Sequence, residues 1–504
     1  MIFSFGSASL ARRLAAVLFL ALVPALPALC QQQAADATPG IIPKDRLKET
    51  WWAERHQAVL EAVQAHPDTQ LLMIGDSITN NYDKSKLPDE NFQPTWQQFY
   101  APRKALNLGF SGDTTANVLW RLDHGEVEGL HPKAAVLLIG TNNTGVGNET
   151  AEQTEAGIDA VIGDLEDRLP ETRILLLGIL PSELSASKTE RDTAVNRYLA
   201  TCYGDNPRVT YLDIGSIYFK NGALNTPIFY DPRLPWHPKA LHPDTEGQHM
   251  MAEAIEPTLA KLMGDAPRMP LTAMSDINTA VIPVPRLEQD SYDWYGRHHA
   301  ELAQQKGMDP QVVLIGDSIT HFWGGLPNAN HVNGPTAWQK AFGGMSVLNL
   351  GFGWDRTQNV LWRLRQGEFE GLHPKWVVVN IGTNNLTGTS NARASTPEEI
   401  VEGVAAICSE VHERSPESHI LLMGIFPRGP RADSPLRASI EETNRLLAQR
   451  FAVDSTVTWL DIDAKFLAPD GTLPAALMLP DFTHPSDAGY QIWADALIQA
   501  GVKP

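Results

Sequence analysis

The chain has 504 residues, 43% of them hydrophobic and 20% charged, and its formal net charge at pH 7 is −19. This is the composition of a globular protein, and it excludes a disordered chain, a collagen and a coiled coil. A surface this acidic repels phosphate backbones, so we expect no nucleic-acid partner. Beyond residue 30 the cysteines are Cys202 and Cys408, and one cysteine in each half predicts two separate buried thiols rather than a disulfide framework.

The N-terminal segment 1–30 has the features of a secretory signal peptide. Two arginines precede an apolar run over residues 14–23, and Ala28 and Cys30 provide small residues at a cleavage site. We therefore predict that the protein is secreted or periplasmic, without a stable membrane span, because the apolar run is too short. Anchoring as a lipoprotein through Cys30 is the less favoured alternative, since Leu29 stands where a small residue is usual.

Short apolar runs alternate with stretches of helix length in the first half of the chain. We expect buried strands at residues 71–74, 134–139, 174–179 and 209–212. Helices are expected between them, at residues 151–169 and 190–202. This alternation is typical of parallel βαβ units and predicts an α/β fold whose sheet is covered on both faces. In such sheets the functional residues gather at the carboxyl ends of the strands.

The second half repeats the landmarks of the first half in the same order. The clearest are Gly-Asp-Ser-Ile-Thr at 75–79 and 316–320, Asn-Val-Leu-Trp-Arg-Leu at 117–122 and 359–364, and Gly-Thr-Asn-Asn at 140–143 and 382–385. A repeat this long indicates two copies of one domain, because solenoid repeats run to roughly 20–50 residues. We predict a signal peptide (1–30), domain 1 (41–263), a linker (264–285) and domain 2 (286–504). A Pro-bearing segment before each copy indicates that part of the linker belongs to the repeat.

Ser77 and Ser318 each follow an apolar run and a Gly-Asp pair. A serine at such a strand-to-helix turn can act as a nucleophile, with backbone N–H groups free to bind an oxyanion, although serine is also a common helix cap. A nucleophilic serine needs a base, and the base needs an orienting partner. In the second copy, Asp481 and His484 stand three residues apart, so the carboxylate can orient the imidazole toward the hydroxyl.

Two further features are shared by the copies. Asn142 and Asn384 end an apolar run in each copy, where their side-chain N–H groups can bind an oxyanion, and where an ordinary role in a turn is the alternative. The shared Val-Leu-Trp-Arg-Leu stretch at 118–122 and 360–364 predicts core packing and one ion pair rather than an active-site element.

These motifs, in this order, resemble the SGNH (GDSL-type) hydrolases over nearly all of both copies. The stretch Gly-Phe-Ser-Gly-Asp-Thr-Thr at 109–115, with the motifs above, is similar to the branch of the platelet-activating factor acetylhydrolase catalytic subunits. The resemblance implies two tandem flavodoxin-like three-layer α/β/α domains with parallel sheets, no metal and no organic cofactor. It implies these site residues: Ser77 and Ser318 as nucleophiles, His242 and His484 as bases, Asp481 as the acid, and Gly112, Trp354, Asn142 and Asn384 at the oxyanion sites.

The two copies depart from the family pattern at different positions. Lys239 stands three residues before His242, where the family places an aspartate, and Asp231 and Asp244 are the other acids nearby. The first copy is therefore open to three interpretations: a slower Ser-His dyad, a site with a substitute acid, or a copy that no longer catalyses. In the second copy, Trp354 replaces the glycine of the oxyanion site. A Trp keeps the backbone N–H, but it costs about 1–2 kcal/mol if the position needs a positive φ.

The resemblance implies a carboxylic-ester hydrolase that removes a short acyl group, acetyl being favoured, from a carbohydrate or a lipid. Domain 2 is expected to hold the better-preserved site. The alternatives are a non-catalytic binding or scaffold protein with degraded domains, and one active domain beside an inactive one. The related subunits pair with each other, so the two domains are also candidates for an internal pseudo-dimer.

Overall fold

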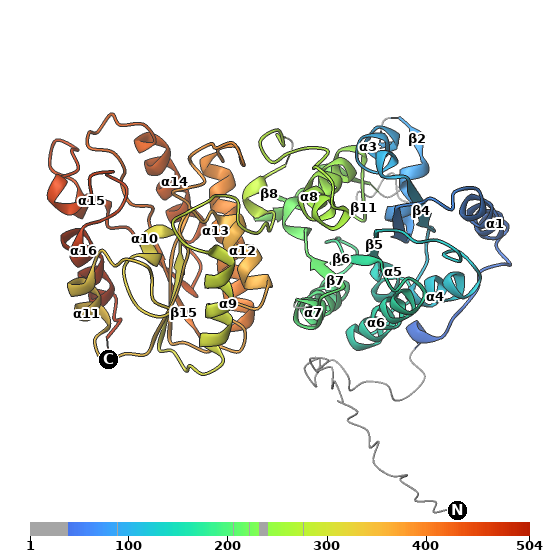
Figure 1. Cartoon of the computed structure of the whole chain (residues 1–504), viewed down its shortest axis with the longest axis horizontal. Helices are drawn as coiled ribbons and strands as arrows, with labels where there is room; N and C mark the ends of the chain where they lie inside the picture. Colours follow the sequence, from blue (N-terminus) through green and yellow to red (C-terminus); the bar gives the residue numbers. More distant parts are fainter. Residues whose placement is uncertain are drawn as a thin grey trace, which may run out of the picture. The chain divides into compact units, whose positions relative to one another are not determined.

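The computed structural model describes residues 39–503, apart from positions 88, 205, 221, 231–239 and 276. The predicted signal peptide and Lys239 lie outside these residues. Each copy of the repeat contains one five-stranded parallel sheet, and helices cover both faces of each sheet (Figure 1). The prediction of two tandem α/β domains with parallel sheets is therefore confirmed.

The two sheets have the same strand order. In the first copy the order is β4 (Ala105–Gly109), β1 (Leu71–Gly75), β5 (Ala134–Leu138), β6 (Arg173–Leu177) and β7 (Val209–Leu212). In the second it is β13 (Val347–Gly351), β12 (Val312–Gly316), β14 (Trp376–Asn380), β15 (His419–Met423) and β16 (Val457–Leu460). The last residue of β1, Gly75, pairs in register with Gly109 and Leu138, so the loops that follow these strands begin at one edge of the sheet.

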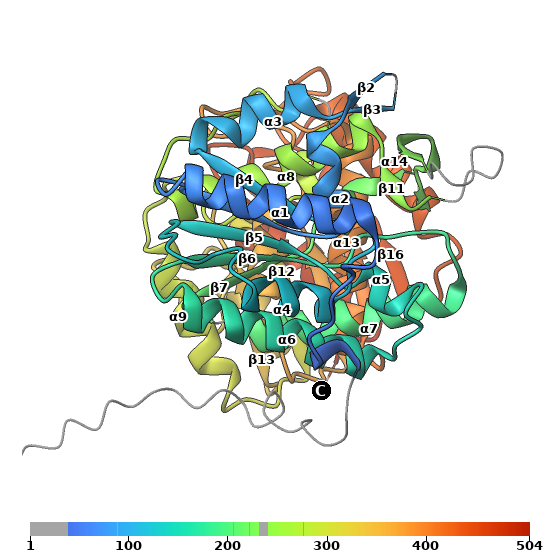
Figure 2. The same ribbon diagram turned by 90° about the vertical axis from the view of Figure 1, so that its right-hand side faces the viewer.

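Alternate residues of each strand of the first copy enter two different cores. Leu71 and Met73 belong to one buried cluster, and Leu72 and Ile74 belong to the other. Figure 2 shows α3 and α8 on one side of this sheet and α4 and α6 on the other. The helices of this copy are α1 (Thr50–Ala65), α2 (Ser77–Asn80), α3 (Gln93–Phe99), α4 (Thr115–Asp123), α5 (Thr141–Thr144), α6 (Ala151–Arg168), α7 (Ala186–Tyr203) and α8 (Thr245–Met263).

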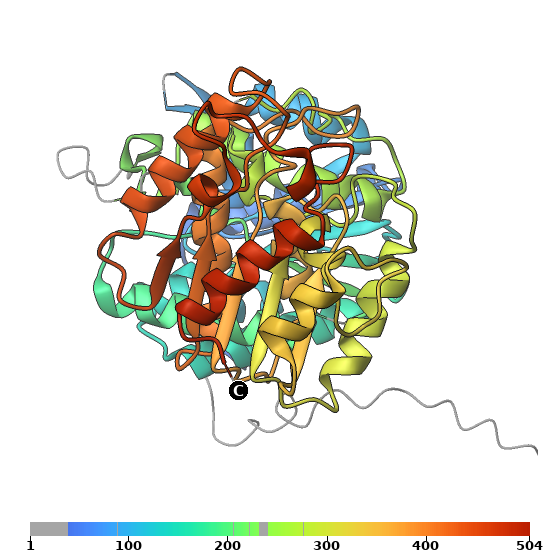
Figure 3. The ribbon, with the colours of Figure 1, turned by 90° about the vertical axis from the view of Figure 1, so that its left-hand side faces the viewer.

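The second copy is built in the same way. Val313 and Ile315 pack with α12 and α13, while Val312 and Leu314 pack with α11 and α16. In Figure 3 the red helix α16 lies in front of the strands of this sheet. The helices are α9 (Trp294–Gln305), α10 (Ser318–His321), α11 (Pro335–Phe342), α12 (Thr357–Arg365), α13 (Pro397–Arg414), α14 (Arg437–Arg450), α15 (Asp463–Phe466) and α16 (Asp487–Gln499).

The edge strand β4 was not among the predicted strands, and neither was its counterpart β13. A polar residue in the middle of each strand, Asn107 or Asn349, interrupts the apolar run. The side chain of Asn107 is buried because it bonds within the fold: Nδ2 donates to Thr79 O at 3.1 Å, and Oδ1 accepts from Gly109 N at 2.9 Å. Asn349 makes the equivalent bonds to Thr320 O and Gly351 N. A search for apolar runs misses such a strand, because a buried amide that is hydrogen-bonded within the fold interrupts the run.

A short 3-10 turn precedes each copy and packs on it in the same way. Thr115 Oγ1 donates to Gly40 O at 2.9 Å, in the turn η2 (Pro39–Ile41). Thr357 Oγ1 donates to Ala280 O at 2.8 Å, in the turn η7 (Thr279–Val281). This part of the predicted linker thus takes the same place in the second copy that residues 39–41 take in the first.

The first copy also contains short strands outside its main sheet. They are β2 (Ser85–Lys86), β3 (Glu90–Asn91), β8 (Phe219–Lys220), β9 (Ala223–Leu224), β10 (Phe229–Tyr230) and β11 (His242–Pro243).

The two cysteines do not share one state. Cys408 on α13 is a buried free thiol, as predicted, and burial raises its pKa to about 12. Cys202 on α7 is disulfide-bonded, so the prediction of a free thiol was wrong for that residue. Spacing along the sequence could not reveal this, because a bridge depends on which chain segments meet in space.

Candidate active site

The Gly-Asp-Ser-Ile-Thr motif forms a tight strand-to-helix turn in each copy. A Cβ on Gly75 would lie 2.4 Å from Leu138 O, so only glycine fits where β1 ends. The next residue, Asp76, caps α2, and its side chain accepts a hydrogen bond from Ile78 N at 2.9 Å. Asp317 caps α10 through Ile319 N at the same distance. Each serine therefore becomes the first residue of a short helix, where backbone N–H groups have no acceptor within the helix.

The first copy brings Ser77 and His242 together. His242 lies in β11, which pairs with β10 so that His242 stands opposite Tyr230. Ser77 Oγ and His242 Nε2 are 2.8 Å apart, within hydrogen-bond distance. Asp244, one of the acids near this histidine, caps α8 by accepting from Gly247 N at 2.9 Å. Asp231 and Lys239 lie outside the described residues.

The second copy brings three predicted residues into one hydrogen-bonded chain. Ser318 Oγ lies 2.8 Å from His484 Nε2, and His484 Nδ1 lies 2.6 Å from Asp481 Oδ2. The carboxylate favours the tautomer with a proton on Nδ1, which leaves Nε2 free to accept the serine proton. This is the arrangement that nucleophilic catalysis by serine requires, and the roles of the residues stay predictions.

The loop that carries Asp481 keeps this carboxylate charged. Partial burial would raise the pKa of Asp481, but hydrogen bonds from His484 and from the backbone N–H of Thr483 outweigh this effect and lower the pKa. A carboxylate that is ionised at neutral pH can hold the imidazole and stabilise its protonated form.

The aspartates that precede the serines have a different electrostatic environment. Asp76 and Asp317 are completely enclosed, and burial raises the pKa of each to about 7. Hydrogen bonds from Ile78 N and Ile319 N favour the charged forms and only partly oppose this effect. The motif therefore places a carboxyl group with a strongly raised pKa directly before each serine, and this repeated feature cannot be inferred from the residue type.

Gly112 and Trp354 occupy equivalent positions and share a left-handed backbone. The φ angle is +79° at Gly112 and +66° at Trp354. Glycine adopts this conformation freely, whereas for other residues it costs about 1–2 kcal/mol. The Trp354 backbone is held by the preceding residue, because Gly353 N donates to His321 Nδ1 at 3.3 Å and Tyr292 OH donates to Gly353 O at 3.2 Å.

The two asparagines meet the loops that follow Gly112 and Trp354. Asn142 Nδ2 donates to Asp113 O at 2.9 Å, and Asn384 Nδ2 donates to Asp355 O at 3.0 Å. An amide nitrogen carries two protons, so each asparagine has a second N–H for a ligand. The predicted oxyanion residues of each copy thus lie on two loops joined by one hydrogen bond.

The Val-Leu-Trp-Arg-Leu stretch does more than its sequence indicated. Its packing in the core is confirmed, but the prediction of one ion pair was wrong, because Arg121 pairs with both Asp113 and Glu126. Arg363 pairs in the same way with Asp355 and Glu368. Asp113 and Asp355 directly follow the predicted oxyanion donors, so each buried arginine fixes an oxyanion loop. Sequence analysis missed this role because the partner carboxylates lie on other segments.

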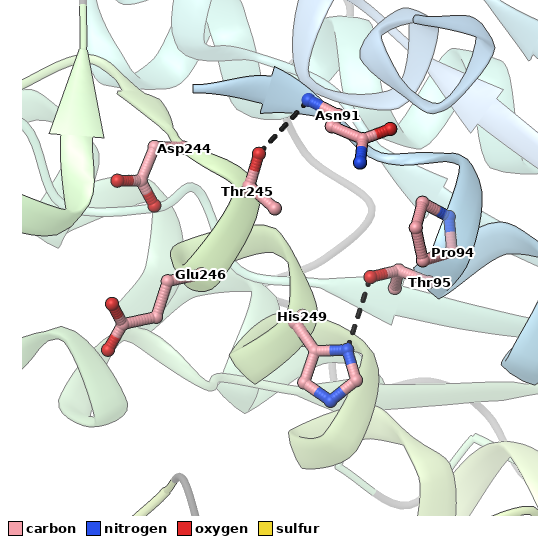
Figure 4. Close-up of a pocket in the computed structure, with 7 residues that line it drawn as sticks. All are labelled: Asn91, Pro94, Thr95, Asp244, Thr245, Glu246 and His249. Atoms are coloured by element: carbon pink, nitrogen blue, oxygen red, sulfur yellow. Dashed lines mark hydrogen bonds between the residues drawn. The ribbon is translucent and has the colours of Figure 1, made fainter. Parts of the chain in front are cut away.

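One pocket of the first copy lies beside the helix that follows His242 (Figure 4). It has a volume of about 420 Å³ and is lined by Asn91, Pro94, Thr95, Asp244, Thr245, Glu246 and His249. Hydrogen bonds link Thr245 Oγ1 to Asn91 N and Thr95 Oγ1 to His249 Nδ1. None of the predicted catalytic or oxyanion residues lines this pocket, so it gives no information about the substrate of the serine site.

Two general features of the described residues bear on function. No helix among them has the length and the apolar character needed to cross a bilayer. No group of three or more His, Cys, Asp and Glu side chains within the described ranges is placed to hold a metal ion. In each copy a serine and a histidine lie within hydrogen-bond distance of each other, and an asparagine bonds to the loop of the other predicted oxyanion residue.

Each copy thus combines a parallel α/β sheet with a serine and a histidine within hydrogen-bond distance of each other. The GDSL-like lipase/acylhydrolase family model matches the chain twice, over residues 73–250 and 314–492. The chain belongs to this family of acylhydrolases and carries two tandem copies of its domain. The prediction of a GDSL-type esterase is therefore confirmed.

Curated relatives and solved structures each match one copy. The platelet-activating factor acetylhydrolase IB subunit alpha1 of Bos taurus is 35% identical over 216 residues, which cover 43% of this chain and 85% of that protein. Subunit alpha2 of Rattus norvegicus is 32% identical over 219 residues, 43% of this chain and 88% of that protein. A solved acetylxylan esterase mutant from Geobacillus stearothermophilus is 21% identical, with a TM-score of 0.32, over 38% of this chain and 94% of that chain.

Proposed function

We propose that this acylhydrolase is an exported serine esterase that removes a short acyl group, in which domain 2 holds the more active site. The observation that carries the proposal is the hydrogen-bonded chain from Asp481 through His484 to Ser318. The chain belongs to an acylhydrolase family, so we infer that this arrangement serves ester hydrolysis. The same three groups activate a serine for attack on an ester carbonyl.

The reaction proceeds in two transfers at Ser318. Its Oγ attacks the acyl carbonyl while His484 Nε2 takes the hydroxyl proton, and the tetrahedral oxyanion receives hydrogen bonds from the Ser318 and Trp354 backbone N–H groups and Asn384 Nδ2. The bond to the alcohol then breaks, and His484 gives its proton to the departing oxygen. Water then attacks the acyl-serine while His484 Nε2 takes its proton, and His484 returns this proton to Ser318 Oγ as the bond to the acid breaks.

The preference for domain 2 rests on the partner of the base. His484 has Asp481 as its partner, and its ring is fixed by that carboxylate. In domain 1 the residue three positions before His242 is Lys239. In a serine protease, replacing the triad aspartate with asparagine lowers turnover by about 10⁴-fold, so we expect the departure from the family pattern at position 239 to cost more activity than the strain at Trp354.

A short acyl group is the favoured substrate part. The curated relatives, which match a stretch about as long as one copy, are named platelet-activating factor acetylhydrolases. We therefore propose that this chain hydrolyses acetyl esters, in which the alcohol is a carbohydrate or a lipid.

A fluorophosphonate probe tests the proposal directly, because it labels serines activated by a base. The mature protein is treated with the probe, the labelled peptide is identified by mass spectrometry, and hydrolysis of a short aryl acetate is followed in parallel. We expect labelling mainly at Ser318, and loss of most turnover in Ser318→Ala. No labelling at either serine, with no hydrolysis, would contradict the proposal. Labelling at Ser77 alone would refute the preference for domain 2.

Export rests on the sequence of residues 1–30. Determining the N-terminus of the protein recovered from its native cells tests it: a mature chain outside the cytoplasm that lacks the apolar run over residues 14–23 is expected. An unprocessed chain confined to the cytoplasm would contradict it. The internal pseudo-dimer is a separate proposal, which small-angle scattering tests. Two lobes that tumble independently would refute it.

A further inference from the structure

The loop after β15 carries an arginine that joins the two loops of the second site. Gly429 N donates to Phe482 O at 2.9 Å, which ties this loop to the segment of Asp481 and His484. Arg428 O accepts a hydrogen bond from Arg437 Nε at 2.8 Å. The backbone of Arg428 is therefore fixed beside the predicted catalytic loop.

The guanidinium of Arg428 lies against the loop of Asn384. Its Nη1 reaches Thr383 O at 3.2 Å, Thr383 Oγ1 at 3.4 Å and Thr387 Oγ1 at 3.5 Å. All three contacts are long, and all end on neutral oxygens. Nε and Nη2, the other edge of the fork, donate to no atom of the described residues. The side chain is only partly buried, and neither of these nitrogens is among the buried side-chain atoms that lack a partner, so this edge is accessible to a ligand.

The acids that face Arg428 do not neutralise it. Asp317 and Asp481 attract the guanidinium, yet burial still lowers the pKa of Arg428, and neither acid forms an ion pair with it in the described part of the chain. Both oxygens of Asp481 are engaged by Thr483 and His484. Asp317 is enclosed and bonded to Ile319 N. The second site thus contains a cation with free donors in a protein of net charge −19.

In the described part of the first copy, a serine stands at the position equivalent to Arg428. Glu183 N donates to Ala240 O at 2.9 Å, as Gly429 N does to Phe482 O, so Ser182 is the equivalent of Arg428. A lysine does lie close to this site, because Lys188 acts electrostatically on Asp76, but its ammonium group is buried in an ion pair with Asp192. The described residues of the two copies therefore differ at this position, where the second copy has a charged arginine and the first a neutral serine.

We propose that Arg428 binds an anionic group on the alcohol part of the ester, so that domain 2 prefers acetyl esters of alcohols that carry a carboxylate or a phosphate. An arginine fork binds such a group through two parallel N–H···O bonds. The proposal rests on the esterase function of Ser318 and adds its substrate class. A neutral alcohol would leave the free edge of the guanidinium without a partner in the bound complex.

The test compares charged and neutral substrates in the Ser77→Ala protein, where only domain 2 can turn over. One pair is the acetylated methyl glucuronide and the acetylated methyl glucoside; the other is acetyl glycerol phosphate and acetyl glycerol. The quantity measured is the ratio of kcat/KM for the charged and neutral member of each pair. We expect a ratio above one for at least one pair, and a fall of about ten- to a hundredfold in Arg428→Ser.

Two variants keep the result interpretable. Arg428→Lys retains the charge without the fork, so it is expected to keep part of the preference. Arg431→Ser removes an arginine on the same loop that pairs with Asp433 and is exposed to solvent, so its ratio should match that of the parent. Labelling of Ser318 by a fluorophosphonate shows that each variant is folded.

The outcomes separate this proposal from the esterase function. A preference only in the sugar pair identifies a carboxylate, and one only in the phosphate pair identifies a phosphate. The same ratio in the parent and in Arg428→Ser, with esters hydrolysed by both, would overturn the inference and leave the esterase function intact. No hydrolysis of any ester would instead overturn the proposed function.

Discussion

The two copies of the domain share the Gly-Asp-Ser-Ile-Thr turn and the contact between serine and histidine, but they differ in the residues around this pair. In both, a serine follows Gly-Asp at the end of the strand next to the sheet edge (β1 or β12), and the serine Oγ lies 2.8 Å from a histidine Nε2. The first copy keeps glycine at the oxyanion loop, while the second places Trp354 there with a φ of +66°. The second copy adds Asp481 and the unpaired Arg428.

The two copies share the buried residues that lie behind their candidate sites. The buried network is the same in both copies: Trp52 and Trp294 donate to Asp113 and Asp355, which pair with Arg121 and Arg363. The differences lie on loops that face solvent and substrate, where a change does not disturb the core. The shared network holds the loops that carry the predicted oxyanion residues, and we expect the solvent-facing loops to set activity and specificity.

The largest effect is expected from Asp481→Asn, measured in the Ser77→Ala protein. The variant loses the carboxylate that holds the Nδ1 proton of His484 and stabilises the imidazolium. We expect kcat on a short aryl acetate to fall by about 10³–10⁴-fold. Asp470→Asn is the matched control, because Asp470 only accepts bonds from Thr472 in an exposed turn. A loss of less than tenfold would show that domain 2 works as a dyad and would remove its advantage over domain 1.

A pH-dependent effect on stability should appear equally in both copies. Burial raises the pKa of Asp76 and Asp317 to about 7, against about 3.9 in an unfolded chain. The folded state then binds more protons than the unfolded state between these values, so stability is lost as the pH rises from about 4 to about 7.

Asp317→Asn and Asp76→Asn remove this loss. We expect each variant to gain stability relative to the parent between pH 4 and pH 8, by at most about 4 kcal/mol for the full difference in pKa. Calorimetric unfolding at the two pH values measures the gain. A difference between variant and parent that is the same at both pH values would contradict the raised pKa. A gain in one copy alone would show that the motifs are not equivalent.

A smaller effect is expected from removing the strain in the second copy. Trp354→Gly removes the strain of a left-handed backbone, which costs about 1–2 kcal/mol. Part of this gain in stability is lost, because glycine has greater conformational entropy in the unfolded chain. We expect the melting temperature of domain 2 to rise by about 2–4 °C. The opposite kind of change, Gly112→Ala, should lower that of domain 1, because a side chain is strained at a φ of +79°. A lower melting temperature for Trp354→Gly would mean that the indole makes stabilising contacts that exceed the strain.

The sequence predicted the fold and the serine, histidine and acid of domain 2, because these depend on motifs repeated in order. It could not predict the sign of φ at Trp354, which follows from the loop bonds to His321 and Tyr292. It also missed Arg428, because Pro427-Arg428-Gly429-Pro430 is an ordinary loop sequence. Only the bond from Gly429 to Phe482 shows that this loop meets the catalytic one.

The proposed function places the more active esterase site in domain 2, at Ser318. The most direct measurement compares the two single-serine proteins, Ser77→Ala and Ser318→Ala, on one short acetyl ester. We expect kcat/KM of Ser77→Ala to be close to that of the parent, and that of Ser318→Ala to be at least about a hundredfold lower, given the value of a triad acid. Equal values for the two variants, or the reverse order, would contradict the claim.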